Sequence, residues 1–246
     1  MPDFVFPPAP AAWVPVAGSA ARFPVHRIYC VGRNFADHAR EMGAEVERGT
    51  PVFFMKPADA VVIDGEVPYP TATGDLHHEV ELVVAIGRDS AGLVAKDHAL
   101  DFVYGYCVGL DLTRRDLQAR AKDKRLPWDT AKGFDASAPL AAIVPVAVAG
   151  HDFTRRLWLE VNGVVRQQAS LSDMIFGVAD IIHELSALFA LRAGDLVFMG
   201  TPSGVAALAP GDRFRAGIDG LGEFSGRIVD HDAVSFQPPQ GGSPWA

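Results

Sequence analysis

The sequence predicts an α+β domain that is mostly β. Many short runs of apolar, β-branched residues are separated by glycine and proline turns, and only a few stretches have helical periodicity. The Asn162-Gly163 pair stands between alternating apolar residues over 158–165 and is the strongest hairpin signal in the chain. Helices do not alternate regularly with strands, which argues against a parallel βαβ fold.

The apolar pattern places the individual elements along the chain. Strands are expected at 26–32, 52–55, 61–63, 76–87, 104–110, 158–165 and 196–199. Helices are expected at 35–42, 96–102, 114–124 and 181–189. Asn34 is placed to cap the first helix and Gly43 to end it. Residues 1–22, rich in proline and alanine, predict an extended N-terminal arm, 23–230 a single domain, and 231–246 a flexible tail.

Composition and charge narrow the classes of function. The 246 residues are 49% hydrophobic and 21% charged, as in globular chains. A net charge of −8 argues against nucleic acid or an anionic membrane as a partner. The most apolar window, 136–150, is too short for a membrane span and contains two prolines. Cys30 and Cys107 are too few for a disulfide framework or a thiolate zinc site, so we expect two core residues of a cytoplasmic protein.

Two glutamates, Glu79 and Glu81, lie at the start of the apolar run 76–87. In a continuous strand both side chains point to one face about 7 Å apart, where their repulsion is roughly 2 kcal/mol at an effective dielectric of about 20. A hard divalent cation would compensate this repulsion, and Asp111, at the end of the strand 104–110, is the candidate third ligand. The alternatives are a solvent-exposed edge strand for the glutamates and a strand-end turn for Asp111.

Other polar residues have the character of groups in a hydrolytic site. His38 and Glu41 are three residues apart on the first predicted helix, as a base and its orienting acid would be, or as a surface ion pair. Lys132 is the only charged residue in 130–134, which suits either a buried anion partner or a surface lysine. The loop 200–204, Gly-Thr-Pro-Ser-Gly, has the form of an anion cradle.

Five motifs, in order along the chain, resemble the fumarylacetoacetate hydrolase superfamily. They are 30–38 (CVGRNFADH), 76–82 (LHHEVEL), 109–118 (GLDLTRRDLQ), 130–132 (TAK) and 200–204 (GTPSG). The resemblance extends from residue 23 to residue 229. Within the superfamily the sequence looks most like the acylpyruvate hydrolases, and its proline-rich opening is similar to that of bacterial fumarylpyruvate hydrolases of gentisate breakdown, an aromatic catabolic route.

This resemblance implies a fold, a cofactor and roles for individual residues. The family fold is a mixed β-sandwich or β-roll, commonly a homodimer, with a short helical lid that would fall near 33–50. The cofactor would be Mg²⁺ or Mn²⁺, with Ca²⁺ as an in vitro substitute. Phe35 stands where relatives often carry tyrosine, so a hydrogen bond from that hydroxyl is absent. The implied roles are Glu79, Glu81 and Asp111 as metal ligands, His38 and Glu41 as a water-activating dyad, Lys132 as a catalytic donor to the oxyanion, Gln118 and Thr201 as substrate-binding residues, and Arg33, Arg114 or Arg115 as partner of a far carboxylate.

The implied activity is metal-dependent hydrolysis of the carbon–carbon bond of an acylpyruvate. The substrate would be a small 2,4-dioxo acid, with fumarylpyruvate giving fumarate and pyruvate, and the metal would hold the charge of the pyruvate enolate. Oxaloacetate decarboxylation and isomerisation or decarboxylation of 2-hydroxy-dienedioates use the same metal chemistry and are alternatives. A β-rich metal-binding or ligand-binding domain without turnover is an alternative from another class.

Overall fold

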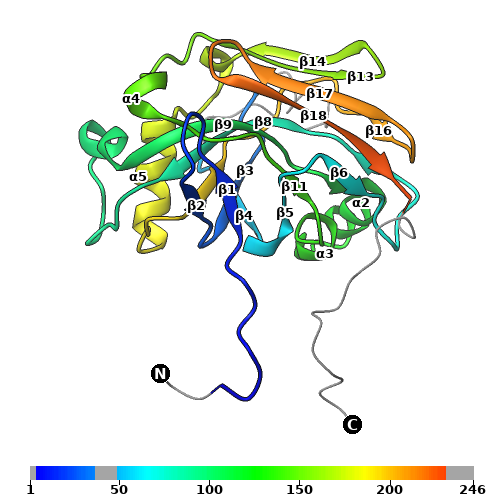
Figure 1. Ribbon diagram of the computed structural model, residues 1–246, viewed down its shortest axis with the longest axis horizontal. Coiled ribbons are helices and arrows are strands. Elements are labelled where there is room, and N and C mark those ends of the chain that lie inside the picture. Colours follow the sequence, from blue (N-terminus) through cyan, green and yellow to red (C-terminus); the bar gives the residue numbers. More distant parts are fainter. Residues whose placement is uncertain (1–3, 37–48, 231–246) are drawn as a thin grey trace.

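The computed structural model describes residues 4–36 and 49–230, and it confirms the predicted mostly-β α+β fold (Figure 1). Two larger sheets dominate the described residues, and short helices lie at their margins. His38, Glu41 and Gly43, most of the predicted helix 35–42, and the predicted tail 231–246 lie outside the described residues. Among the described helices, none is long and apolar enough to cross a membrane.

The larger sheet has six strands and contains β8 (Val80–Ile86), the longest described strand in which every residue is buried. The strand order of this sheet is β12 (Val144–Pro145), β9 (Val103–Leu110), β8, β15 (Leu196–Phe198), β3 (Ile28–Gly32) and β4 (Val52–Lys56). All seven residues of β8 are buried, because β8 pairs with β9 on one side and β15 on the other. A continuous apolar run is the pattern expected for such a central strand.

The second sheet covers one face of the first. Its order is β14 (Val164–Ser170), β13 (Arg156–Val161), β17 (Arg213–Ile218), β18 (Gly222–Val229) and β6 (Glu66–Pro68). Strand β13 contacts β8, and β17 and β18 contact β9, so the two sheets stack as a sandwich (Figure 1). The predicted hairpin is confirmed as β13–β14, where Asn162 (φ 52°) and Gly163 (φ 78°) have the positive φ angles of a two-residue turn.

Small sheets and short helices complete the described part of the chain. The small sheets are β10 (Thr113–Arg114), β7 (Leu76–His77) and β16 (Ala207–Leu208), then β11 (Ala138–Pro139) with β5 (Val61–Val62), and β1 (Trp13–Pro15) with β2 (Arg22–Pro24). The α-helices are α2 (Arg115–Asp123), α3 (Asp129–Lys132), α4 (Val146–Ala149) and α5 (Val178–Leu188), and the 3₁₀ helices are η1 (Ala58–Ala60), η2 (Lys96–Phe102) and η3 (Leu171–Asp173). Helices α2 and α3 pack on each other, and α3 also contacts β4.

The N-terminal segment expected to be an extended arm contains the β1–β2 hairpin. Val14 is fully buried, and the guanidinium of Arg22 lies 4.0 Å from the centre of the Trp13 ring. The segment is attached to the body by two backbone hydrogen bonds with Ile143, one from Ala17 N and one to Pro15 O, each 2.8 Å long.

Candidate active site

The acidic run predicted as one strand is two strands joined by a bend, so that part of the prediction is wrong. Strand β7 ends at His77, β8 begins at Val80, and the two strands belong to different sheets. The carbonyl of Glu79, inside the bend, accepts a 2.8 Å hydrogen bond from Asp111 N. Strand alternation therefore does not set the direction of the Glu79 side chain, whereas Glu81 still lies within β8.

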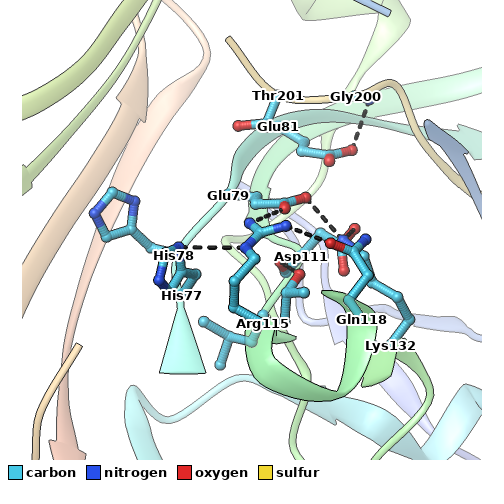
Figure 2. Close-up of polar contacts among 12 residues, drawn as sticks. His77, His78, Glu79, Glu81, Asp111, Arg115, Gln118, Lys132, Gly200 and Thr201 are labelled. Atoms are coloured by element: carbon cyan, nitrogen blue, oxygen red, sulfur yellow. Dashed lines mark hydrogen bonds and ion pairs between the residues drawn. The ribbon is translucent and has the colours of Figure 1, made fainter. Parts of the chain in front are cut away.

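The bend nevertheless brings the three predicted metal ligands together. Glu79, Glu81 and Asp111 are 5%, 1% and 0% exposed, and each offers an oxygen within 4.8 Å of the others (Figure 2). Asp111 follows the last residue of β9, which pairs with the first residue of β8. An exposed edge strand is excluded as an explanation for the two glutamates, because β8 lies inside the sheet and both side chains are buried.

Three basic side chains neutralise part of this cluster. Lys132 Nζ donates to Glu79 Oε2 at 2.8 Å and to Asp111 Oδ2 at 2.6 Å, and the Arg115 guanidinium pairs with Glu79 Oε1 (Figure 2). Lys56 Nζ lies 2.8 Å from Asp111 Oδ1, and both side chains are fully buried. Lys132 is 2% exposed, so the alternative of a surface lysine is also excluded. Three carboxylates thus face three cations.

The environment of Glu81 differs from that of the other two acids. Its Oε2 accepts a 2.7 Å hydrogen bond from Gly200 N, and no ion pair involves Glu81 within the described part of the chain. Burial raises the pKa of Glu81 well above its usual value, and the charges of Asp111 and Glu79 raise it further. A divalent cation among these oxygens would offset that cost.

Asp111 Oδ1 is a second sign that the oxygens suit a metal. This atom is buried and accepts no hydrogen bond from the described residues, because its contact with Lys56 has the distance but not the angle of a hydrogen bond. Clustered carboxylate oxygens are the donors that Mg²⁺, Mn²⁺ and Ca²⁺ prefer. The donor set therefore fits the predicted divalent ion.

The loop predicted as an anion cradle binds the protein's own carboxylate. Its first amide, Gly200 N, holds Glu81, and the Thr201 hydroxyl donates to Val80 O at 2.9 Å. Gln167 Nε2 donates to Thr201 Oγ1 at 2.8 Å, and Gln167 Oε1 accepts from Val80 N at 3.0 Å. Gln167 thus links this loop to the bend before β8. Sequence reasoning missed Gln167, because it lies beyond the predicted hairpin 158–165 and a lone polar residue there gives no signal of burial.

The two histidines of the motif play supporting roles in the geometry. His77 Nε2 lies 2.9 Å from Asp75 Oδ1, and its Nδ1 accepts a hydrogen bond from Arg115 Nε at 3.3 Å. His78 Nδ1 lies 2.9 Å from Gln167 Oε1. Burial lowers the pKa of both rings, which favours neutral side chains at pH 7. Their contacts orient Arg115, which pairs with Glu79, and Gln167, which accepts from Val80 N.

The start of the predicted lid is attached to the body by Asn34. Its Nδ2 donates to Met199 O at 2.7 Å and to Phe176 O at 3.0 Å, and its Oδ1 accepts from Phe176 N at 2.8 Å. Arg33, just before it, has a positive φ of 61°. The helix that Asn34 is expected to cap lies mainly outside the described residues, so its capping role stays a prediction.

A pocket opens next to the carboxylates and collects every described residue of the predicted site except Arg114. Arg114 instead donates from Nη1 to Thr130 O at 3.1 Å. The pocket walls also contain Phe54, Lys122 and Trp128, which sequence reasoning did not select. Lys122 comes four residues after Gln118 in a predicted helix. This spacing places both side chains on one helix face, and it was the sequence signal that could have added Lys122 to the predicted site. The full lining is Val31, Gly32, Arg33, Phe54, Glu79, Glu81, Asp111, Arg115, Gln118, Lys122, Trp128, Lys132 and Thr201.

Comparison with known proteins gives one family and two kinds of relative. Residues 27–229 match the family model described as fumarylacetoacetate (FAA) hydrolase C-terminal. The crystal structure of fumarylpyruvate hydrolase from Pseudomonas aeruginosa, in complex with Mn²⁺ and pyruvate, is 46% identical with a TM-score of 0.89 and covers 92% of this chain and 99% of that one.

Curated relatives have names that refer to oxaloacetate. Oxaloacetate tautomerase FAHD1, mitochondrial, of Rattus norvegicus is 45% identical over 195 residues, which are 79% of this chain and 87% of the relative. Oxaloacetate decarboxylase, mitochondrial, of Dictyostelium discoideum is 40% identical over 197 residues, which are 79% of this chain and 89% of the relative.

Proposed function

The chain belongs to the fumarylacetoacetate hydrolase family, and from this membership we propose that it hydrolyses the carbon–carbon bond of an acylpyruvate, with fumarylpyruvate as substrate. The observation that carries the proposal is the likeness to the Pseudomonas aeruginosa fumarylpyruvate hydrolase, which extends over 92% of the chain. The buried carboxylates next to a pocket with aromatic walls support a site for a chelating, unsaturated acid.

In the proposed reaction, water adds to the distal carbonyl and the bond to the neighbouring methylene breaks. The hydroxyl group ends on the released fumarate, and a proton ends on the methyl group of pyruvate, so the reaction needs no other reactant. Glu79, Glu81 and Asp111 would hold Mg²⁺ or Mn²⁺, which when bound supplies stabilisation of negative charge on the pyruvate half.

Lys132 and Gln118 are proposed to donate hydrogen bonds to the oxyanion that forms at the attacked carbonyl. Burial alone would lower the pKa of Lys132, but the charges of Asp111 and Glu79 outweigh it and raise the pKa above its ordinary value. The ammonium therefore stays protonated and can serve as a donor. Thr201 and Arg33 line the same pocket and are proposed to contact substrate. His38 and Glu41 are proposed to activate water on the basis of the motif 30–38 alone.

Conversion of oxaloacetate is the second candidate function, and the names of the curated relatives favour it. Oxaloacetate shares the 2-oxo acid half that a metal would chelate, but its tautomerisation or decarboxylation requires no activated water. The two functions therefore differ in their need for the proposed His38–Glu41 dyad.

Purified protein supplied with Mn²⁺ or Mg²⁺ separates the two candidates. We expect pyruvate release from fumarylpyruvate with a higher kcat/KM than any conversion of oxaloacetate, and loss of release after metal removal. Conversion of oxaloacetate without cleavage of any acylpyruvate would reject the hydrolase proposal. In His38→Ala we expect hydrolysis to be lost while oxaloacetate decarboxylation persists. Equal loss of both would reject water activation as the role of His38.

The cytoplasmic location and the homodimer stay predictions for this chain. The curated relatives are named as mitochondrial proteins, so location is best tested directly, by fractionation of cells that express the protein. Sedimentation of the purified protein would test the homodimer.

A further inference from the structure

The pocket contains two basic residues in addition to those that neutralise the carboxylates. Arg115 and Lys132 are paired with Glu79 and Asp111. Arg33 and Lys122 line the same pocket, and neither forms an ion pair with another residue in 4–36 or 49–230. The pocket wall thus has positive charge that the carboxylate cluster does not use. An anionic ligand group is the natural partner of such a charge.

Lys122 is held at an aromatic wall that leads away from the carboxylates. Its Nζ lies 5.4 Å from the centre of the Trp128 ring, and the Trp128 and Phe54 rings lie 5.8 Å apart at an angle of 57°. Lys132 Nζ, which contacts the carboxylates, lies 4.9 Å from the centre of the Phe54 ring. The two rings therefore connect the proposed reaction centre to Lys122. A flat, unsaturated chain can pack along such a wall.

We propose that Lys122 binds the far carboxylate of the substrate, while Phe54 and Trp128 pack against its planar chain, so that the site selects dicarboxylic acylpyruvates. This inference rests on the proposed function and names its substrate class. In fumarylpyruvate the second carboxylate stands at the far end of the unsaturated chain. In oxaloacetate it occupies the position of the scissile carbonyl, next to the reaction centre, and acetylpyruvate lacks it.

The electrostatic environment of Lys122 supports this role. Burial, together with repulsion from Arg115, Arg33 and Lys132, lowers the pKa of Lys122 to about 8, although Glu79 opposes the shift. A carboxylate that arrives at Lys122 relieves this repulsion, so the gain from pairing is larger than at a hydrated surface lysine. Arg33 is exposed and therefore better solvated.

The experiment measures the ratio of kcat/KM for fumarylpyruvate to kcat/KM for acetylpyruvate. In Lys122→Met we expect this ratio to fall at least about ten-fold, the effect of losing one hydrogen bond to a charged group. Lys122→Arg keeps the charge and should restore most of the ratio. Lys124→Met removes an exposed lysine just after the same helix and should leave the ratio unchanged. An unchanged ratio in a folded Lys122→Met protein would overturn the proposal.

Ligand binding tests the inference independently of turnover. Fumarate and crotonate share one carbon skeleton, but only fumarate has a second carboxylate. By calorimetry on the Mn²⁺-supplied protein, we expect fumarate to bind more tightly than crotonate, and Lys122→Met to abolish the difference. Equal binding of the two acids by the wild-type protein would overturn the assignment of Lys122. Absence of acylpyruvate cleavage, with the fumarate preference present, would instead reject the proposed function and retain the assignment.

Discussion

Replacing Lys56 with methionine should destabilise the fold far more than replacing Lys96 with methionine. The two lysines form ion pairs of similar length, 2.8 Å to Asp111 Oδ1 and 2.7 Å to Asp180 Oδ1. Both side chains of the first pair are fully buried, whereas those of the second are 51% and 21% exposed. The comparison therefore changes burial while it keeps residue types and distance nearly constant.

The size of each stability loss depends on whether the remaining carboxylate stays buried without its lysine. At 2.8 Å two unit charges attract by about 6 kcal/mol at an effective dielectric of about 20. Much of this attraction only compensates the hydration energy that both charged groups lose when they are buried. Removing one partner of a buried pair costs about 3–5 kcal/mol, because the other charge stays buried. Lys56 also donates to the carbonyls of Leu112 and Lys132, although Asp111 keeps its bond from Lys132. We therefore expect a loss of about 3 kcal/mol for Lys56→Met and about 0–1 kcal/mol for Lys96→Met.

The assay is equilibrium urea unfolding of the three proteins in the presence of a chelator, since a metal ion bound to Asp111 would mask the effect. A loss of about 3 kcal/mol corresponds to a fall in Tm of about 6–12 °C for a chain of this size. If the two variants lose stability equally, with unchanged unfolding slopes, the reasoning from burial is refuted.

Three more predictions follow from the core, the metal ligands and the pocket. Gly109→Ala should cost about 1–3 kcal/mol of unfolding free energy, because a Cβ there would lie 2.6 Å from Leu140 and 3.0 Å from Phe198. Gly74→Ala serves as the control, since a Cβ at residue 74 has nothing within 4 Å. Equal losses of unfolding free energy in the two variants would contradict this prediction. Mn²⁺ at a hundred times its dissociation constant should stabilise the protein by about 2.7 kcal/mol in thermal unfolding. The Glu81→Gln variant should lose most of this stabilisation. The same stabilisation in the variant as in the wild-type protein would place the ion elsewhere. Because Lys122 is protonated below its pKa of about 8, KM for fumarylpyruvate should rise as pH increases through that value, and a parallel rise for acetylpyruvate would argue against Lys122.

Much of the fold could be predicted from local sequence patterns, since single strands, turns and helices depend mainly on residues that are neighbours in the chain. The apolar run before Gly87, the Asn162-Gly163 turn and the period of α5 each predict an element that the structure contains. The bend between His77 and Val80 was not predictable in this way. It depends on Gln167, which comes from the hairpin of the other sheet, and on Asp111 N.

The candidate site shows the same division. Glu79, Glu81 and Asp111 could be selected because carboxylates at the ends of apolar strands are conspicuous, and family motifs support them. Lys56 also ends an apolar strand, but its partner Asp111 is far away in the sequence, and only the folded structure brings the two side chains together. Lys122 and Trp128 lie in a charged helix and the loop after it, where composition alone indicates a solvated surface.

The carboxylates and the pocket wall come from parts of the molecule with different tolerance to change. The oxygens that we propose to hold the metal belong to β8, to Asp111 directly after β9 and to the bend before β8, all inside the core, whereas Lys122 and Trp128 belong to short elements at its margin (Figure 1). Substitutions at the margin change few buried contacts and therefore cost little stability. Under the proposed function, evolution can thus alter the acyl group that is accepted while it keeps the chemistry of the pyruvate half. Two relatives that are each nearly half identical to this chain can accordingly carry the names of different substrates.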